Sequence, residues 1–177
     1  QNGARIRMRA EPNVYPARGA LQLVVAKVRL QGEGDLAMRR EALRRKLEAE
    51  GLLDPARKRP LPSDPRVVGV VTSATGAAFA DIVKVARRRG AVRILLSPAQ
   101  VQGEAAPAQL IRALQRIEQV AEVDVVIIGR GGGSPEDLAA FDDEGLARAI
   151  ASCSKVVVAA VGHEVDWSIA CMVADVR

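Results

Sequence analysis

The residues that decide the fold read VDVVIIGRGGGS and occupy positions 123–134. An apolar run ends at Ile128 and passes directly into a glycine-rich loop, and a helix-length segment begins at Glu136. Short apolar runs of this kind are typical of strands that are buried on both faces of a parallel sheet. The stretch therefore predicts a strand, a loop at its carboxyl end, and a helix after the loop.

Three other apolar runs repeat this arrangement, and helix-length segments separate them. The expected strands cover residues 67–71, 92–96, 123–128 and 156–161, and the expected helices cover residues 77–89, 106–120, 136–151 and 166–174. Strands that alternate with helices form βαβ crossovers in a parallel sheet. The sequence predicts an α/β fold, namely a Rossmann-like open parallel sheet with helices on both faces.

The first third of the chain has a different pattern. Alternation at 5–10 and an apolar run at 21–30 predict two strands, with turn residues from Pro12 to Gly19 between them. A charged amphipathic helix is expected over 34–51, followed by a proline-rich basic linker. We expect three parts: the end of an N-terminal β domain at 1–33, a connecting helix and linker at 34–65, and an α/β domain at 66–177.

Basic residues are concentrated in the first third. Residues 1–65 hold 14 Lys or Arg and 8 Asp or Glu, whereas residues 66–177 hold 12 and 13. A basic surface attracts polyanions such as nucleic acids through counterion release. An ordinary solvated helix face accounts for the same counts equally well.

Cys153 and Cys171 are the only cysteines, and their spacing fits neither a disulfide framework nor a zinc site. No apolar run is long enough to cross a membrane, and residues 1–5 do not resemble a signal peptide. These features predict a cytoplasmic protein without a membrane partner. Because the chain starts with Gln1 rather than Met, we expect it to be a piece of a longer one.

Candidate phosphate-binding residues follow the expected strands. Ligands of open parallel sheets bind beyond the carboxyl ends of the strands. The loops at those ends carry hydroxyls, glycines and titratable groups, so we expect them to meet at one rim. They hold Thr72, Ser73, Thr75 and Gly76 after the first strand, residues 129–134 after the third, and residues 162–166 after the fourth.

The loop at 129–134 gives the strongest signal. The backbone N–H groups of Gly131, Gly132 and Gly133 can turn inward around an anion, and a helix that opens after Ser134 adds to the positive field. Arg130 can make a bidentate contact with a phosphate. The loop is neither a dinucleotide fingerprint nor a P-loop. A flexible turn with a surface Arg is the simpler alternative.

Two titratable side chains are candidates for proton transfer at this rim. Asp81 lies on an otherwise apolar stretch of the expected helix over 77–89, where a buried carboxylate needs a partner. His163 is the only histidine, and imidazole titrates near neutral pH. The structural alternatives are an exposed Asp, a polar loop His, and plain helix capping by residues 72–76.

These segments together resemble the catalytic domain of the exonuclease VII large subunit family. The resemblance rests on VVTSATGAA at 70–78 with Asp81, on GRGGGS at 129–134 with Glu136, Asp137, Leu138 and Phe141, and on AVGHE at 160–164 with Asp166. It extends from about residue 17 to the end of the chain. Several separate motifs occur in the same order, so the resemblance is specific.

The resemblance implies an exodeoxyribonuclease that degrades single-stranded DNA from either end to oligonucleotides. It implies that Asp81, Arg130, His163 and Asp166 occupy catalytic positions, and that residues 1–33 are the last part of an OB-fold. It also implies a small-subunit partner that binds a helical region outside this chain. Two residues depart from the family pattern: Cys171 stands where Asp is usual, and Asp142 where Asn is usual.

The expected mechanism holds the scissile phosphate against Arg130 and the glycine loop, with His163 as general base or acid steered by Asp166 or Asp81. It requires no cofactor and assigns no metal ligand. Dependence on Mg²⁺ stays open, because Asp81, Glu164 and Asp166 are the carboxylates placed nearby.

Two alternative functions remain at this point. One is a non-catalytic fragment that binds single-stranded nucleic acid, and an assay for DNA cleavage separates it from the nuclease. The other is a Rossmann-like domain that binds a small nucleotide or sugar phosphate. Comparing the affinities for oligonucleotides and mononucleotides across salt concentrations separates that one.

Overall fold

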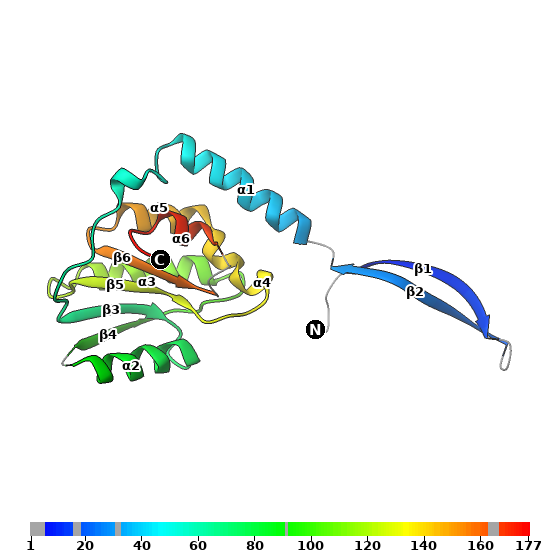
Figure 1. The fold of residues 1–177 in the computed structure, drawn as a ribbon, viewed down its shortest axis with the longest axis horizontal. Coiled ribbons are helices and arrows are strands. Elements are labelled where there is room, and N and C mark those ends of the chain that lie inside the picture. The colour runs from blue at the N-terminus through cyan, green and yellow to red at the C-terminus, as the bar shows by residue number, and fades with distance from the viewer. Residues whose placement is uncertain (1–5, 16–18, 31–32, 91, 163–166) are drawn as a thin grey trace. The chain divides into compact units, whose positions relative to one another are not determined.

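The computed structural model describes residues 6–15, 19–30, 33–90, 92–162 and 167–177 (Figure 1). The chain divides into two compact units, residues 1–39 and residues 40–177. The candidate site lies in the second unit. The domain limits expected at residues 33 and 65 stay predictions.

The first unit contains a two-stranded antiparallel sheet of β1 (Ile6–Tyr15) and β2 (Ala20–Leu30). This confirms the small antiparallel β unit, whereas its membership of an OB-fold stays a prediction. The turn expected from Pro12 onward was wrong, because β1 continues through Pro12 and Asn13 to Tyr15. Each strand of a two-stranded sheet has a free edge, so a proline without an N–H donor is tolerated there.

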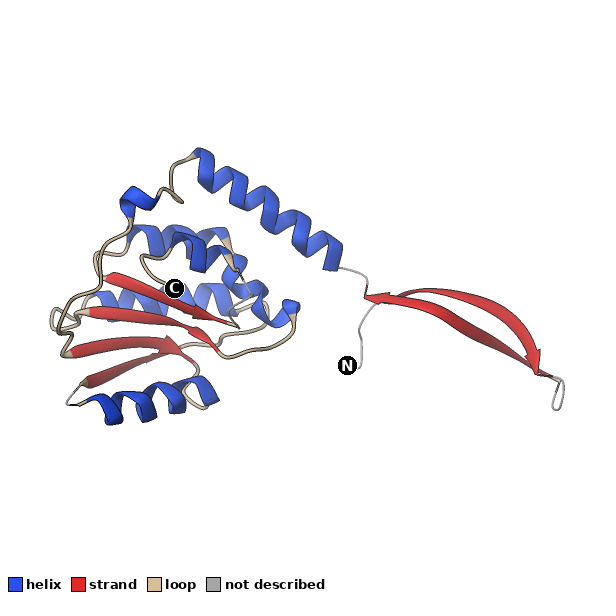
Figure 2. Ribbon diagram, viewed as in Figure 1, coloured by secondary structure: helices blue, strands red, loops and turns tan. Residues whose placement is uncertain are grey.

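The second unit is built on a four-stranded parallel sheet. Its strands are β3 (Val67–Thr72), β4 (Arg93–Pro98), β5 (Val125–Arg130) and β6 (Val156–Val161), in the order β4-β3-β5-β6 (Figure 2). After β6 the chain returns to the sheet, where Val176 forms a parallel bridge with Val158. The Rossmann-like parallel sheet predicted from the sequence is confirmed.

Helices connect these strands and precede them. They are α1 (Glu33–Ala49), the 3-10 turn η1 (Pro55–Arg57), α2 (Ala77–Arg89), α3 (Ala106–Glu118), α4 (Pro135–Leu138), the 3-10 turn η2 (Ala139–Asp142), α5 (Glu144–Ser152) and α6 (Ile169–Val173). The single helix expected over 136–151 was wrong. Asp143 has an extended backbone there, and its side chain accepts a hydrogen bond from the Leu146 N–H, so it ends one helical segment and begins α5.

Alternate residues of the strands build two separate apolar clusters, one on each face of the sheet. Val68, Val70 and Val125 pack with Phe79 and Ile82 of α2 on one face. The side chains between them face the larger core, which α3, α5 and α6 cover. That core includes Val71, Val126, Ile128, Val157, Leu110, Leu114, Leu146, Ile150 and Ile169. The expected placement of helices on both faces is therefore confirmed.

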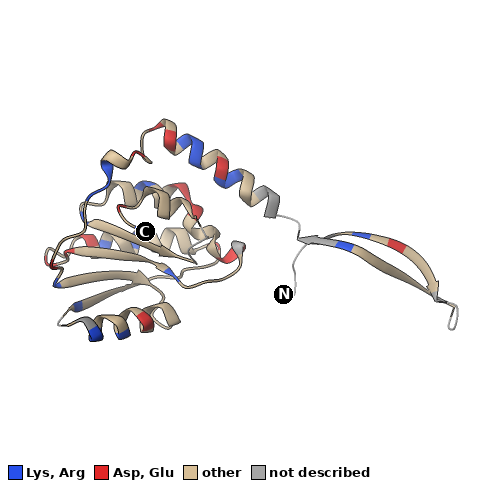
Figure 3. Ribbon diagram, viewed as in Figure 1, with Lys and Arg blue, Asp and Glu red and all other residues tan. Residues whose placement is uncertain are grey.

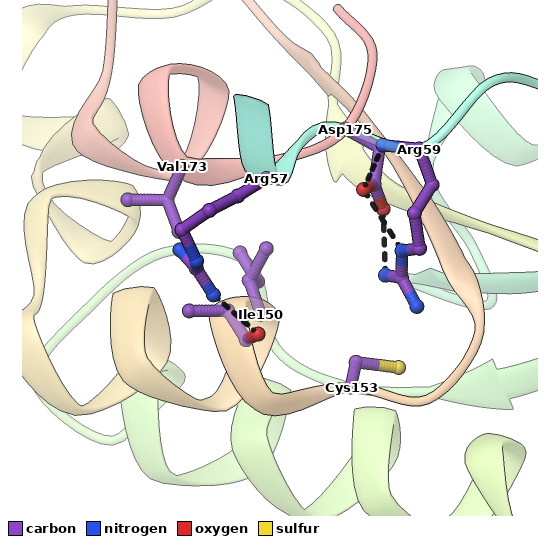
Figure 4. Close-up of a pocket in the computed structure, with 7 residues that line it drawn as sticks. Arg57, Arg59, Ile150, Cys153, Val173 and Asp175 are labelled. Carbon is purple, nitrogen blue, oxygen red and sulfur yellow. Dashed lines mark hydrogen bonds and ion pairs between the residues drawn. The ribbon is translucent and has the colours of Figure 1, made fainter. Parts of the chain in front are cut away.

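Three consecutive basic residues at the end of η1 attach the segment before β3 to the rest of the second unit. They are Arg57, Lys58 and Arg59. Figure 4 shows Arg57 and Arg59 beside a cavity of ≈ 230 Å³ that Cys153 and Asp175 also line. Arg59 forms an ion pair with Asp175 at 2.8 Å, and Arg57 donates to the carbonyls of Leu52 and Ala151. Lys58 donates to two carbonyls of the α6 region. These contacts hold residues 57–59 against α6 and the start of β6.

Asp175 is the centre of this attachment. Its carboxylate is 8% exposed and also accepts the backbone N–H groups of Arg59 and Val157. Burial alone raises the pKa of Asp175, but the hydrogen bonds from Arg59 and Val157 outweigh it and hold that pKa below its usual value. Because the pKa of Asp175 is lower in the folded protein than in the unfolded chain, its ionised carboxylate stabilises the fold at pH values above the unfolded pKa. This stabilisation is lost as the pH falls through the folded pKa.

We therefore expect Asp175→Asn to lower the free energy of unfolding by about 3 kcal/mol at pH 7. The difference from the wild type should shrink as the pH falls below about 4, and it should be lost once the pH passes the folded pKa of Asp175, which lies below the usual value. Urea unfolding at pH 7 and at a series of lower pH values measures this. Glu122→Gln is the control, because its ion pair with Arg93 is exposed on both sides and is worth at most about 1 kcal/mol. Equal losses in the two variants at pH 7 would contradict this role of Asp175.

Candidate functional site

The strand order creates a switch point beside β3. The chain leaves β3 through α2 toward β4 on one side, and then crosses back through α3 to β5 on the other side. The loops that follow β3 and β5 therefore diverge and leave a crevice at the carboxyl edge of the sheet. Open α/β sheets bind their ligands in such crevices.

A cavity of ≈ 260 Å³ lies at this switch point. Four predicted site residues line it: Thr72 at the end of β3, Asp81 on α2, and Arg130 and Gly131 at the end of β5. Apolar side chains of the strands and small residues of the loops form the rest of its wall. They are Val70, Ala78, Ile82, Ile127, Gly129, Ala160 and Gly162.

Gly129 allows β5 and β6 to approach each other beside the cavity. It pairs with Ala160, and a Cβ atom on Gly129 would lie 1.8 Å from the Ala160 carbonyl oxygen. No side chain fits there without displacing the backbone of β6. The glycine is therefore required by the strand pairing that positions the next residue, Arg130.

The Arg130 guanidinium is held by hydrogen bonds to its own loop. Nε donates to the Gly131 carbonyl, Nη2 to the Gly132 carbonyl, and Nη1 to the Asp137 carbonyl, at 3.0–3.1 Å. Nη1 also donates to the side-chain oxygen of Gln102 at 3.0 Å. A guanidinium has five N–H groups, so one of them is left for a ligand in this arrangement. A bidentate phosphate contact requires one of the carbonyl contacts to open.

Gln102 is a supporting residue that the functional reasoning from sequence did not identify. It lies in the loop after β4, at the same edge of the sheet, and its amide oxygen fixes one side of the guanidinium. The resemblance to the family includes residues 101–103 but assigns Gln102 no role, and its position after a strand was the other available signal. No charge or glycine pattern distinguished it from its neighbours.

The rest of the glycine loop is fixed by local contacts. Ser134 and Asp137 form a capping box, in which each side chain accepts the backbone N–H of the other. A Cβ atom on Gly133 would lie 2.6 Å from Nη2 of Arg130, so the loop closes tightly over the guanidinium. The α4 helix has only four residues, and the field expected from its N-terminus is correspondingly small.

The end of β3 and the loop after it contribute unequally to the cavity. Thr72 is buried and lines it, whereas Ser73 and Thr75 are not among the lining residues, and Thr75 is exposed. Gly76 is the N-cap residue of α2 and has an extended backbone, without a side-chain hydrogen bond to the cap. The phosphate-binding roles predicted for Ser73, Thr75 and Gly76 stay predictions.

His163 and Asp166 lie outside the residues that the structure describes, as does Glu164. The residue before His163 is described. Gly162 lines the cavity, has a φ of 67°, and donates its N–H to the Arg130 carbonyl at 3.3 Å. The loop that carries His163 therefore leaves β6 directly beside Arg130.

The two departures from the family pattern have local structural roles. Cys171 on α6 is 1% exposed within the larger core, and its Sγ lies 3.7 Å from the Ala159 carbonyl oxygen. It does not line the switch-point cavity. Asp142 accepts the Ile169 N–H at 2.8 Å, a contact that an Asn side-chain oxygen can also make, and burial raises the pKa of Asp142.

Much of the positive charge counted at residues 40–65 is engaged in contacts within the fold. Figure 3 marks the basic and acidic residues along the ribbon. Arg44 and Arg45 form ion pairs with Glu41, and their hydrogen bonds lower the pKa of Glu41 to about 2. Lys46 forms an ion pair with Glu144 of α5. Arg59 forms its ion pair with Asp175, and Arg57 and Lys58 donate hydrogen bonds to backbone carbonyls. The charge count therefore overstates the free cationic surface of residues 40–65.

The comparison with protein families covers the part of the chain that forms this cavity. The family described as "Exonuclease VII, large subunit" matches residues 52–177, which include all the strands of the parallel sheet. The chain belongs to the exonuclease VII large subunit family. The match contains the cavity residues and the loop that carries His163.

Curated relatives of this family align with the whole chain. The exodeoxyribonuclease 7 large subunit of Syntrophotalea carbinolica is 49% identical, and the chain covers 44% of it. The proteins of the same name from Cronobacter sakazakii and Koribacter versatilis are 49% and 47% identical, and the chain covers 39% of each. The chain thus spans about two-fifths of the length of these relatives.

The described residues form no membrane-spanning helix and no cluster of metal ligands. None of the helices they form combines the length and the apolar character that a membrane span requires. The same residues contain no group of three or more His, Cys, Asp or Glu side chains arranged to hold a metal ion. These residues do not include His163, Glu164 and Asp166, which lie outside the part of the chain that the structure describes.

We expect Gly129→Ala to destabilise the second unit by about 3 kcal/mol, because the added methyl group overlaps the backbone of β6. Gly131→Ala is the matched control for stability, because a Cβ atom there meets nothing within 4 Å. Urea unfolding measures the effect. A Gly129→Ala protein as stable as Gly131→Ala would show that β5 and β6 are not so closely paired.

Proposed function

We propose that this chain carries the catalytic part of an exodeoxyribonuclease that hydrolyses the phosphodiester bonds of single-stranded DNA to oligonucleotides, from either end. The observation that carries the proposal is the meeting of Thr72, Asp81 and Arg130 on one cavity at the switch point. Membership of the exonuclease VII large subunit family supports it. The partner in this proposal is the small subunit of such an enzyme, bound outside the residues of this chain.

Arg130 binds the scissile phosphate in this proposal. Its charge is permanent, and its carbonyl contacts fix the guanidinium before a ligand arrives. A preorganised cation stabilises the negative charge that develops on the phosphoryl oxygens as water attacks phosphorus. Thr72, from the other side of the crevice, offers a hydroxyl to the same phosphate.

His163 transfers the proton in this proposal. Water attacks the phosphorus, the bond from phosphorus to the leaving ester oxygen breaks, and the proton of the water passes to a base while the leaving oxygen receives one. His163 follows Gly162, whose N–H bonds to the Arg130 carbonyl. Asp81 and Asp166 are the carboxylates assigned to orient the imidazole.

The two roles predict different losses in the enzyme assembled from the large and small subunits. His163→Ala should lower the rate of cleavage of a single-stranded oligonucleotide by at least about 100-fold, with little change in affinity. Arg130→Ala should lower both the rate and the affinity, because it removes a charge that contacts the phosphate. Cleavage kinetics and fluorescence anisotropy measure the two quantities.

Arg112→Ala is the control, since Arg112 is exposed on α3, on the other face of the sheet. It should leave both quantities unchanged. Near-wild-type cleavage by His163→Ala would remove His163 from the mechanism and leave the proton transfer to a carboxylate. Unchanged binding and cleavage in Arg130→Ala would contradict the assignment of the cavity as the active site.

A further inference from the structure

Most basic side chains of the second unit are occupied by contacts within the protein. Ion pairs engage Arg40, Arg44, Arg45, Lys46, Arg59, Arg66, Arg93 and Arg148, and hydrogen bonds to carbonyls engage Arg57, Lys58, Arg116 and Lys155. Among the basic side chains described between residues 40 and 162, four have no such contact: Lys84, Arg87, Arg88 and Arg112. Three of these four are on α2.

The α2 helix connects these free cations to the cavity. Its first turns contribute Ala78, Asp81 and Ile82 to the cavity wall. Lys84 and Arg88 follow Asp81 by three and seven residues, so they continue the same side of the helix. Both are exposed, and Figure 3 shows basic residues along the second half of α2. A cationic stripe therefore leads away from the site along this helix.

Helix stability does not explain this arrangement. Cations stabilise the last turn of a helix through its dipole, which accounts for Arg87 and Arg88. Lys84 lies in the middle of α2, beyond the reach of that effect. Lys84 and Arg88 are four residues apart, a spacing at which like charges destabilise a helix. No ion pair between Asp81 and Lys84 compensates for this among the described contacts.

We propose that Lys84 and Arg88 bind consecutive phosphates of single-stranded DNA beside the phosphate held by Arg130. This inference rests on the proposed function and extends its substrate site along α2. The two residues are about 6 Å apart along the helix axis and offer unpaired charges that a nucleic-acid backbone neutralises with release of counterions. Their place next to the cavity makes them positioning residues for the strand.

The test is equilibrium binding of thymidine oligonucleotides to the whole 177-residue chain. Each phosphate contact with a single strand contributes about 0.7 to the slope of log affinity against log salt, or about fivefold in affinity near 0.1 M salt. The double variant K84A/R88A should therefore bind a long oligonucleotide about 25-fold more weakly, with the slope reduced by about 1.4. It should bind a dinucleotide, which reaches only the cavity, like the wild type.

The matched control is R66A/R112A, which removes the same charge from exposed positions away from the cavity. Arg66 precedes β3 at the opposite edge of the sheet, and Arg112 is on the other face. This variant should keep the wild-type affinity within about twofold. The variant K84Q/R88Q keeps the length of the side chains and should behave like K84A/R88A. Circular dichroism and urea unfolding establish that each variant is folded.

Two outcomes overturn the proposal in distinguishable ways. If K84A/R88A and R66A/R112A lose affinity and salt slope equally, the α2 stripe acts only through net charge and the proposal is wrong. The proposed function survives that result if Arg130→Ala weakens oligonucleotide binding in the same experiment, because the cavity then still binds the strand. If the wild-type chain binds no oligonucleotide of any length, the stripe and the proposed function fail together.

Discussion

The parallel pairing of β3 with β4 on one side and β5 on the other is the constraint on which the site depends. It makes the chain leave β3 and β5 in different directions and opens the crevice where Thr72 and Arg130 meet. The close approach of Gly129 to Ala160 extends the same order to β6, and the Gly162 N–H then joins the next loop to Arg130. The backbone of the sheet thus brings Thr72 and Gly162, which are 90 residues apart in the sequence, to the same cavity.

The glycine loop makes contacts in this structure that its sequence does not suggest, and the anion binding expected of its N–H groups stays a prediction. Glycine-rich loops at the ends of strands commonly bind anions through their N–H groups. Here the carbonyls of Gly131 and Gly132 face the Arg130 guanidinium, and Gln102 and the Asp137 carbonyl complete its coordination. The loop therefore fixes a cation, and in the proposed function it is that cation which binds the anionic substrate. Such preorganisation lowers the cost of ordering a long side chain in the transition state.

The sequence predicted the sheet well because buried parallel strands leave continuous apolar runs that local composition reveals. Strands β3 and β6 and helix α2 were found within a residue of their observed bounds. The segment at 136–151 was predicted poorly, because its apolar periodicity continues across the cap at Asp143. Gln102 was missed for a related reason: its role depends on which loop the fold brings beside Arg130, and no local pattern encodes that proximity.

The same limit applies to charge. A count of Lys and Arg indicated a basic first third, but ion pairs and carbonyl contacts consume much of that charge in residues 40–65. Among the basic side chains described between residues 40 and 162, three of the four without such contacts lie on α2, in a part of the sequence with no net positive charge. Composition reports how many charges there are, whereas the electrostatic surface depends on which of them are already paired.

The most direct test of the site is an amide chemical-shift titration of the 177-residue chain with a thymidine oligonucleotide. The account predicts that the largest shifts occur at Thr72–Gly76, Gly129–Gly133 and Gly162, with smaller shifts along α2. Shifts confined to β1, β2 and α1, with the carboxyl edge of β3 and β5 unperturbed, would contradict the claim that single-stranded DNA binds at the switch point.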